Sequence, residues 1–202
     1  MRQNVIVFGK FLNCGQTCVA PDYIYCDPEI KEALVAELRR QITRQYGKEA
    51  LKNRNYGKII NEKHFDRINS LIDPSKTVCG GGSNRETLQI EPTVLDNVTF
   101  EDPVMQQEIF GPVLPVLTYD SLGGAVTKIN SMAHPLALYI FTEDEKMPGK
   151  LLPDVVSAVA VSTMSSYIWQ PAIWASAALV KAAWDPIMAS TASGHSLIIR
   201  VL

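Results

Sequence analysis

Four cysteines could supply a nucleophile in this chain of 202 residues, and Cys18 stands in the most suitable surroundings. It ends a polar, glycine-containing segment, FLNCGQTC (residues 11–18), between two apolar runs. A reactive thiolate needs such a place, partly exposed on a rigid scaffold and close to groups that favour the anion. A free cysteine is more often a small buried hydrophobic residue. We expect that role for Cys26, within an apolar run, and for Cys79, beside a glycine turn.

The other groups that could do chemistry do not cluster. Cys14 and Cys18 are separated by three residues, and no second cysteine pair or histidine cluster follows, so we predict no metal site. The three histidines, His64, His134 and His195, are scattered and give no support for a Cys–His pair. Four cysteines are too few for a disulfide framework at this length, which indicates reduced thiols in a cytosolic protein.

The first half of the chain carries patterns that predict the elements around Cys18. The apolar residues 5–8 predict a short buried strand, and residues 23–26 predict another. Asp27 is a suitable N-cap for a helix with Pro28 at its first position. Apolar residues then recur at every fourth position, and Gly47 supplies the C-terminal stop: they are Ile30, Leu34, Leu38, Ile42 and Tyr46.

The following segments alternate between strand and helix patterns. A second helix is expected over residues 61–72 and a third over residues 121–130. The glycine run at residues 80–82 lacks the G-x-G-x-x-G spacing of a phosphate site and is interpreted as a turn. Strand-like apolar runs lie at residues 77–78, 91–95, 113–117 and 136–141. This alternation predicts an α/β fold with a largely parallel sheet.

Composition sets limits on the partners. The chain is 47% hydrophobic and 20% charged with a net charge of −2, which is typical of a globular domain and gives no basic footprint for nucleic acid. We expect no secretory leader and a cytoplasmic location. Residues 155–180 are uncharged and long enough to cross a bilayer. They also contain six Ser/Thr residues, Gln170 and a central Pro171, so a membrane helix is not favoured.

Two motifs in order give the chain a family resemblance. The segment FLNCGQTCVAPDY (residues 11–23) is similar to the cysteine active-site signature of aldehyde dehydrogenases, most of all in their class 3 branch. The segment EIFGP (residues 108–112), preceded by PVMQ (residues 103–106), resembles a second motif of that family. The resemblance covers about residues 5–146 and favours Cys18 as the nucleophile.

The resemblance implies a mechanism and a cofactor. The Cys18 thiolate would attack an aldehyde, and backbone N–H groups with an asparagine side chain would stabilise the oxyanion. The adduct would pass hydride to NAD or NADP and leave a thioester for hydrolysis to a carboxylic acid. Glu108 would bind the hydroxyls of the nicotinamide ribose, and Phe110 would pack beside the nicotinamide. Without the motif, Glu108 would be a surface carboxylate and Phe110 a core aromatic. The family also implies a homodimer.

The same resemblance implies that parts are missing. In the family the coenzyme-binding domain, the general base and the oxyanion asparagine precede the cysteine, and here seventeen residues precede Cys18. Asn13 belongs to the cysteine motif itself. We therefore expect residues 1–156 to be a partial catalytic domain, with the coenzyme-binding domain mostly absent and turnover impaired. The alternatives are a non-catalytic remnant that at most binds intact subunits and, with less support, a thiol-dependent esterase using Cys18.

The C-terminal part departs from the family pattern. After about Pro153 the expected ending gives way to a charge-poor tail that holds all three tryptophans. Back-translation in a shifted frame permits strings such as FGGVGESGMGSYHGK, which resemble the family's C-terminal motifs in the family's order. We infer a frameshift near residues 156–158. Residues 157–202 are then an aberrant tail that is not natively folded.

Overall fold

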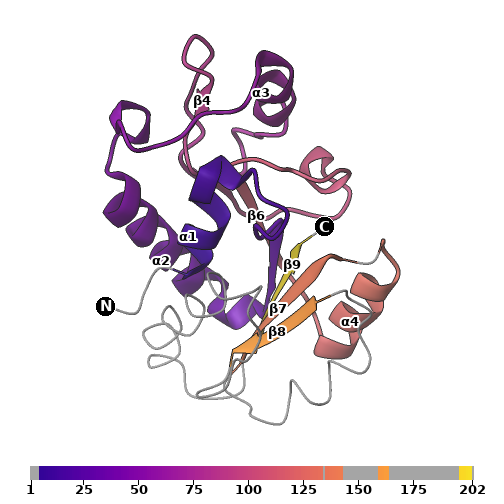
Figure 1. Cartoon of the computed structure of the whole chain (residues 1–202). Helices are drawn as coiled ribbons and strands as arrows, with labels where there is room; N and C mark the ends of the chain where they lie inside the picture. The colour runs from indigo at the N-terminus through magenta and orange to yellow at the C-terminus, as the bar shows by residue number, and fades with distance from the viewer. Residues whose placement is uncertain (1–4, 134, 143–158, 164–195, 202) are drawn as a thin grey trace.

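The computed structural model describes residues 5–133, 135–142, 159–163 and 196–201. A seven-stranded sheet in the order β2–β5–β6–β1–β9–β7–β8 runs through it (Figure 1). A separate two-stranded sheet joins β3 to β4. The strands are β1 (Tyr23–Cys26), β2 (Thr77–Cys79), β3 (Ser83–Asn84), β4 (Gln89–Ile90), β5 (Thr93–Leu95), β6 (Val113–Thr118), β7 (Ala137–Thr142), β8 (Val159–Thr163) and β9 (Ser196–Val201).

Most strands of the large sheet run in one direction. The pairs β5–β6, β6–β1 and β7–β8 are parallel, with Ile24 of β1 opposite Val116 of β6. Strand β9 is antiparallel to both β1 and β7, so those two strands also run the same way. Only β9 and the edge strand β2 oppose the other five. The predicted α/β fold with a largely parallel sheet is confirmed.

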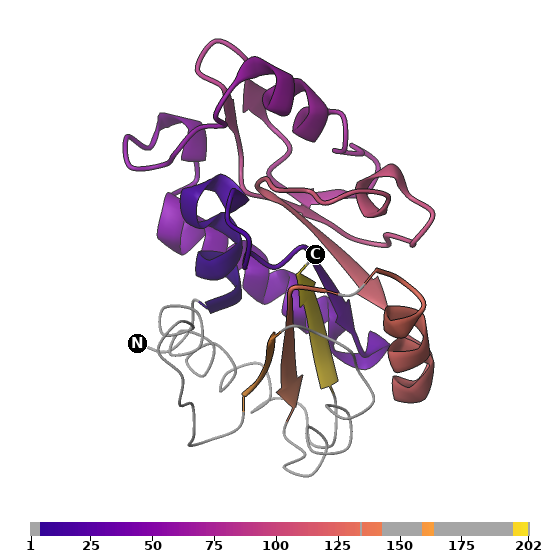
Figure 2. The same cartoon turned by 45° about the vertical axis from the view of Figure 1, so that its right-hand side comes forward.

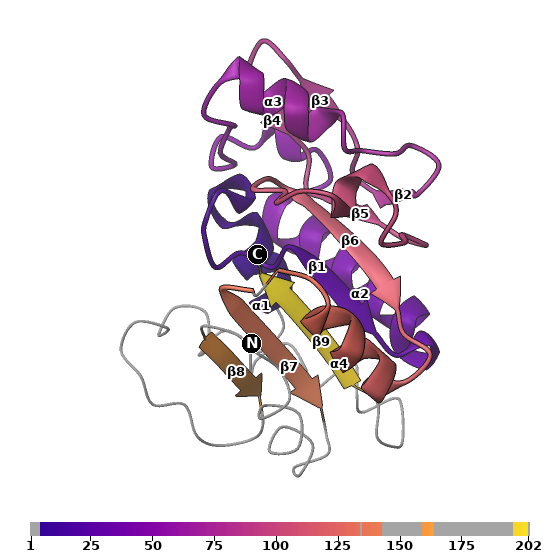
Figure 3. The same cartoon turned by 90° about the vertical axis from the view of Figure 1, so that its right-hand side faces the viewer.

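Helices cover both faces of the sheet. Figure 3 shows α4 on the face turned to the viewer and α2 on the opposite face. Figure 2 shows α3 and the β3–β4 pair stacked beyond one end of the sheet. The helices are α1 (Val5–Phe11), α2 (Pro28–Tyr46), α3 (Glu62–Asn69) and α4 (Leu122–Asn130), with short 3-10 turns η1 (Leu12–Gly15), η2 (Ala50–Lys52) and η3 (Pro103–Met105).

The period-two alternation of β1 divides the core into two layers. Tyr23 and Tyr25 belong to the cluster that contains Ala125 and Ile129 of α4. The intervening Ile24 and Cys26 belong to the cluster that contains the apolar stripe of α2. Because successive side chains of a strand point to opposite faces, a strand covered on both sides is buried throughout. All four residues of β1 are buried accordingly.

The helix that follows β1 was predictable from its own residues. The Asp27 carboxylate accepts a hydrogen bond of 2.9 Å from the Glu29 N–H, and Pro28 takes the first helical position. At the other end Gly47 has φ +86°, a conformation that glycine adopts without steric cost. The buried residues of the helix include the predicted Ile30, Leu34, Leu38 and Ile42.

One predicted element is wrong. Residues 5–8 were expected to form a strand, but they belong to helix α1. Ile6 and Val7 are buried, and so are Lys10 and Phe11 four residues later, which is the spacing of one helix face. Ile6, Val7 and Phe11 pack in the same cluster as α2. A short apolar run does not distinguish a buried strand from a buried helix turn, and here packing against α2 decides between them.

Most of the remaining predictions agree in type and differ at the boundaries. Helix α3 begins after its N-cap Asn61, as expected, but ends at Asn69 rather than at residue 72. Gly80 and Gly81 have φ values of +70° and +93°, but residues 80–82 form an irregular connection between β2 and β3, and the turn lies at residues 85–88. The predicted frameshifted tail stays a prediction. Within it the structure describes β8 and β9, which pair with the sheet.

The uncharged stretch at residues 155–180 lies outside the described residues except for positions 159–163. Among the helices that the structure describes, none is long and apolar enough to cross a membrane.

Candidate active site

Cys18 lies in the loop between η1 and β1, where its side chain is exposed. Three successive residues ahead of it have positive φ: Asn13 at 50°, Cys14 at 54° and Gly15 at 73°. Glycine and asparagine tolerate this region, whereas a residue such as Cys14 held there costs about 1–3 kcal/mol and persists only when its surroundings fix it. The backbone ahead of Cys18 is therefore held in place rather than relaxed.

The Gln16 side chain ties this loop to the segment before α3. Its Nε2 donates to the Asn13 carbonyl at 3.0 Å and to the Lys58 carbonyl at 3.1 Å. Its Oε1 accepts from the Ile60 N–H at 3.0 Å. The Gln16 side-chain amide thus pairs with the backbone of residues 58–60 in the way that the backbone of a neighbouring β-strand pairs, with one donated and one accepted hydrogen bond. From the side of the sheet, the Tyr139 hydroxyl donates to the Val19 carbonyl at 3.1 Å.

The other three cysteines lack the exposure that a nucleophile needs. Cys14 is 1% exposed, and burial raises the pKa of its thiol to about 11 against the opposing hydrogen bonds of Tyr56 and Gly57. Burial raises the pKa of Cys26 to about 12 and also raises the pKa of the half-buried Cys79. These thiols stay protonated near neutral pH, as expected for packing residues. Cys18 is the exposed one of the four.

The predicted coenzyme residues lie in a loop that contacts the cysteine loop. A Cβ atom added to Gly15 would stand 2.3 Å from the carbonyl oxygen of Gly111, so the two backbones touch. The contact follows from topology, because one loop leads into β1, the other leads into β6, and these strands are parallel neighbours. Segments that precede neighbouring parallel strands meet at the same edge of the sheet. The structure therefore brings together the two motifs that stand about 90 residues apart in the sequence.

Glu108 and Phe110 flank a buried residue. Ile109 is fully buried, whereas the Glu108 side chain is exposed and Phe110 is 40% exposed with φ +44°. The exposure of Phe110 rules out the alternative prediction that its ring is buried in the core. An accessible carboxylate and an accessible aromatic ring, held on either side of one anchored residue, suit a ligand with hydroxyl groups and a flat ring.

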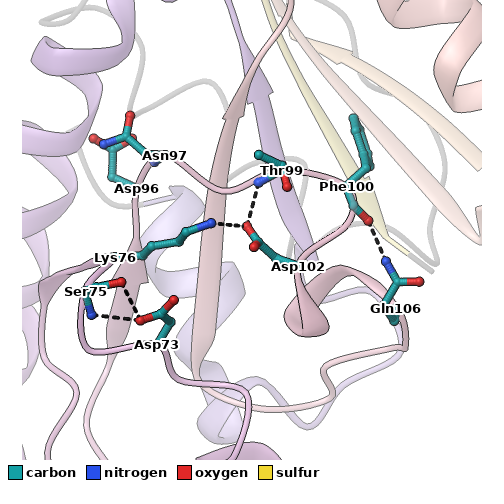
Figure 4. Close-up of polar contacts among 9 residues, drawn as sticks. All are labelled: Asp73, Ser75, Lys76, Asp96, Asn97, Thr99, Phe100, Asp102 and Gln106. Atoms are coloured by element: carbon teal, nitrogen blue, oxygen red, sulfur yellow. Dashed lines mark hydrogen bonds and ion pairs between the residues drawn. The ribbon is translucent and has the colours of Figure 1, made fainter.

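The loop that leads to these residues is braced by its own polar contacts (Figure 4). Asp102 accepts from the Lys76 ammonium at 2.5 Å and from the Thr99 N–H at 2.7 Å. The Gln106 amide donates to the Phe100 carbonyl at 2.6 Å. A cavity of about 250 Å³ is lined by residues of this part of the loop, among them Asp102, Pro103 and Val104, but by no residue of segments 11–23 and 108–112.

Comparison with known proteins shows the family to which the chain belongs. The family model described as "Aldehyde dehydrogenase family" matches residues 3–161, which is most of the chain. This chain belongs to the aldehyde dehydrogenase family. The match ends five residues beyond the boundary predicted at residue 156.

Relatives of known name and structure agree. The chain is 46% identical over 152 residues to the dimeric NADP-preferring aldehyde dehydrogenase of Rattus norvegicus, covering 75% of this chain and 34% of the relative. The Bos taurus protein of the same name is 45% identical, with 64% of its length covered. The chain thus spans about a third of the rat relative and just under two thirds of the bovine one.

Two solved structures share the fold. The substrate-bound state of the Staphylococcus aureus AldH matches with a TM-score of 0.76 and 41% identity, over 78% of this chain and 35% of that one. The Mycobacterium tuberculosis aldehyde dehydrogenase complexed with NAD⁺ matches with a TM-score of 0.68 and 25% identity, over 82% and 36%.

Two buried charged residues, Lys10 and Asp22, interact with the segment of Glu108 and Ile109, and the two motifs predict no role for either of them. Lys10, in α1, is 1% exposed; burial lowers its pKa to about 8, against attraction from Asp22 and Glu108. Asp22 is buried and accepts from the Ile109 N–H at 3.1 Å. Lys10 follows Ile6 by four residues, which in a helix places both side chains on the same buried face. The strand predicted for residues 5–8 did not allow this inference.

Proposed function

We propose that this chain carries the nucleophile and part of the coenzyme site of an NAD(P)-dependent aldehyde dehydrogenase that oxidises an aldehyde to a carboxylic acid. The observation that supports it most is the contact between the Cys18 loop and the loop of Glu108 and Phe110, made through Gly15 and Gly111. Family membership supports the reaction class, and the rat relative's name supports NADP. The M. tuberculosis complex supports NAD⁺ as the other choice.

In this proposal the Cys18 sulfur attacks the carbonyl carbon of the aldehyde and forms a thiohemiacetal. The exposed thiol on an anchored loop suits that step, because the sulfur is accessible while its backbone is fixed by Gln16 and Tyr139. Loss of hydride from this adduct leaves a thioester on Cys18, which water then hydrolyses.

The residues present fit a nicotinamide nucleotide. The Glu108 carboxylate is exposed and can accept hydrogen bonds from ribose hydroxyls, and the Phe110 ring is exposed beside it. When bound, the coenzyme supplies the hydride acceptor. Glu108 and Phe110 would hold the nicotinamide end of the coenzyme close to the Cys18 loop.

The proposal extends to the setting of the protein. The rat relative is named as dimeric, and we propose a homodimer for the protein to which this chain corresponds, in the cytoplasm. The rival function is a non-catalytic remnant that at most binds intact subunits.

Initial rates distinguish these functions. The purified chain is mixed with an aldehyde and NADP⁺ or NAD⁺, and formation of the reduced coenzyme is followed by absorbance. The dehydrogenase proposal predicts a coenzyme-dependent rate that Cys18→Ser abolishes. A folded chain that gives no reduced coenzyme, even in a first-turnover burst, would support the remnant.

A further inference from the structure

We infer that Arg67 is a positioning residue that sets the conformation of Glu108 and Phe110 for coenzyme binding, an inference that rests on the proposed function of these two residues. Arg67 lies near the C-terminal end of α3 and reaches across to the loop before β6. Its Nη1 donates to the Glu108 carbonyl at 3.1 Å and its Nη2 to the Ile109 carbonyl at 2.7 Å. A weaker contact of 3.3 Å joins Nη1 to the Gln107 side chain.

These bonds act on the peptide groups that decide where the two side chains point. The peptide group between residues 108 and 109 is held at both ends, since Arg67 binds its carbonyl and Asp22 accepts from its N–H at 3.1 Å. The Ile109 side chain is fully buried, which fixes the loop from below. The backbone of Glu108 is therefore fixed on its C-terminal side, and its remaining freedom is mainly rotation about its side-chain bonds.

The next peptide group carries the strained residue. The Ile109 carbonyl lies in the same plane as the Phe110 N–H, so its orientation helps to set φ of Phe110. That φ is +44°, which costs a residue with a Cβ about 1–3 kcal/mol and needs support from its surroundings. The 2.7 Å bond from Arg67 to the Ile109 carbonyl supplies that support.

The same helix holds the other side of Phe110. A Cβ atom on Gly111 would stand 2.7 Å from the Ile68 side chain, so Gly111 packs closely against α3. Arg67 and Ile68 are consecutive residues, and together they fix the peptides before and after the strained position. A planar guanidinium can bind two successive carbonyls at once, which a lysine ammonium does less well.

The test uses the full chain and the variants Arg67→Met and Arg67→Lys. Arg85→Met is the matched control, because Arg85 also binds α3, through Asp66 at 3.0 Å and Glu62 at 2.9 Å, but at exposed carboxylates away from the loop. The first measurement is amide hydrogen exchange of peptides spanning residues 104–112. Arg67→Met is expected to speed exchange of the Ile109 amide about tenfold while the rest of α3 keeps its protection. Arg67→Lys should fall between it and the wild type.

The second measurement is the dependence of the initial rate on NADP⁺ at saturating aldehyde. Loss of positioning should raise the KM for NADP⁺ about tenfold with a smaller change in kcat, and Arg67→Lys should recover part of it. If Arg67 only stabilised the fold, Arg67→Met would lower the fraction of folded, active protein and leave the KM for NADP⁺ unchanged. That result would overturn the inference.

Unchanged exchange at residues 104–112 in Arg67→Met would overturn the inference as well, as would equal effects of Arg67→Met and Arg85→Met. Absence of coenzyme reduction by the wild-type chain would contradict the proposed function instead. The exchange measurement would then still decide whether Arg67 holds this loop.

Discussion

The backbone of Gly15 lies directly against the carbonyl of Gly111, with room for a hydrogen at Gly15 and none for a methyl group. Gly15 also has φ +73°, so any other residue there would be strained as well as crowded. This contact joins the loop of the candidate nucleophile to the loop of the candidate coenzyme residues. The hydrogen bond of 3.1 Å from the Ile109 N–H to the Asp22 carboxylate joins the same two loops.

Gly15→Ala should separate the two loops. The methyl group would stand 2.3 Å from the Gly111 oxygen, a backbone atom that cannot move aside cheaply. We expect a loss of about 2–4 kcal/mol in the free energy of unfolding, combining left-handed strain with the displaced backbone. Urea unfolding measures it. Gly123→Ala is the control, because a Cβ atom there meets nothing within 4 Å on helix α4. Equal midpoints for the two variants would show that the contact is not tight.

The four thiols should react with iodoacetamide at very different rates near neutral pH. Cys18 is exposed, whereas Cys14 and Cys26 are buried with pKa values raised to about 11 and 12. We expect peptide mapping to find Cys18 alkylated first and Cys14 and Cys26 alkylated only on unfolding. Cys18→Ser should remove the fast phase. Fast labelling of Cys14 in the folded chain would contradict the assignment of roles.

Stability should rise with pH between about 7 and 9 because of Lys10. Burial lowers its pKa in the folded chain from 10.5 to about 8, so in this range the unfolded chain binds more protons than the folded chain does. The free energy of unfolding then increases with pH, by about 1 kcal/mol across the range. Urea midpoints at several pH values measure the slope. Lys10→Met should flatten it, and a wild-type slope that is flat or falling would refute the effect.

Removal of the Gln16 amide should loosen the Cys18 loop without unfolding the core. Gln16→Leu keeps the approximate volume of the side chain but loses its three hydrogen bonds, to Asn13, Lys58 and Ile60. Each such bond contributes about 0.5–1.5 kcal/mol, so the three together predict a loss of about 1.5–4.5 kcal/mol in the free energy of unfolding. Proteolysis within residues 12–20 should become faster in the variant. Unaltered cleavage and an unaltered urea midpoint would show that the amide does not hold this loop.

The tail carries a prediction of its own. If the frame shifts near residues 156–158, sequencing of the coding DNA should find a single-base insertion or deletion there. Restoring the frame should give the family's C-terminal motifs. A clean reading frame through this region would refute the frameshift.

Helix α2 was predictable because its cap, stripe and stop all lie within one segment. The N-cap Asp27, the apolar residues at every fourth position and the terminal Gly47 all indicate the same helix. Tertiary packing therefore did not change the structure that these local signals predict. Residues 5–8 lacked such agreement, since four apolar residues fit a strand or a helix equally well. The prediction failed there because α1 buries Ile6 and Phe11 against α2.

The candidate site was predictable only in part for a similar reason. Cys18, Glu108 and Phe110 were found through motifs whose letters are contiguous. Arg67 and Lys10 interact with the second motif from other elements. Arg67 binds Ile109 across 42 residues of sequence, and Lys10 is attracted to Glu108 across 98 residues. No local pattern marks such partners, because their roles arise only once the chain has folded.

Mass spectrometry of an acid-quenched first turnover tests the central claim most directly. The chain is mixed with an aldehyde and NADP⁺, quenched and digested. The proposal predicts one acyl group on the peptide that contains Cys18, absent without NADP⁺ and absent in Cys18→Ser. No acyl group on a folded chain, or an acyl group on another cysteine, would contradict the assignment of Cys18 as the nucleophile.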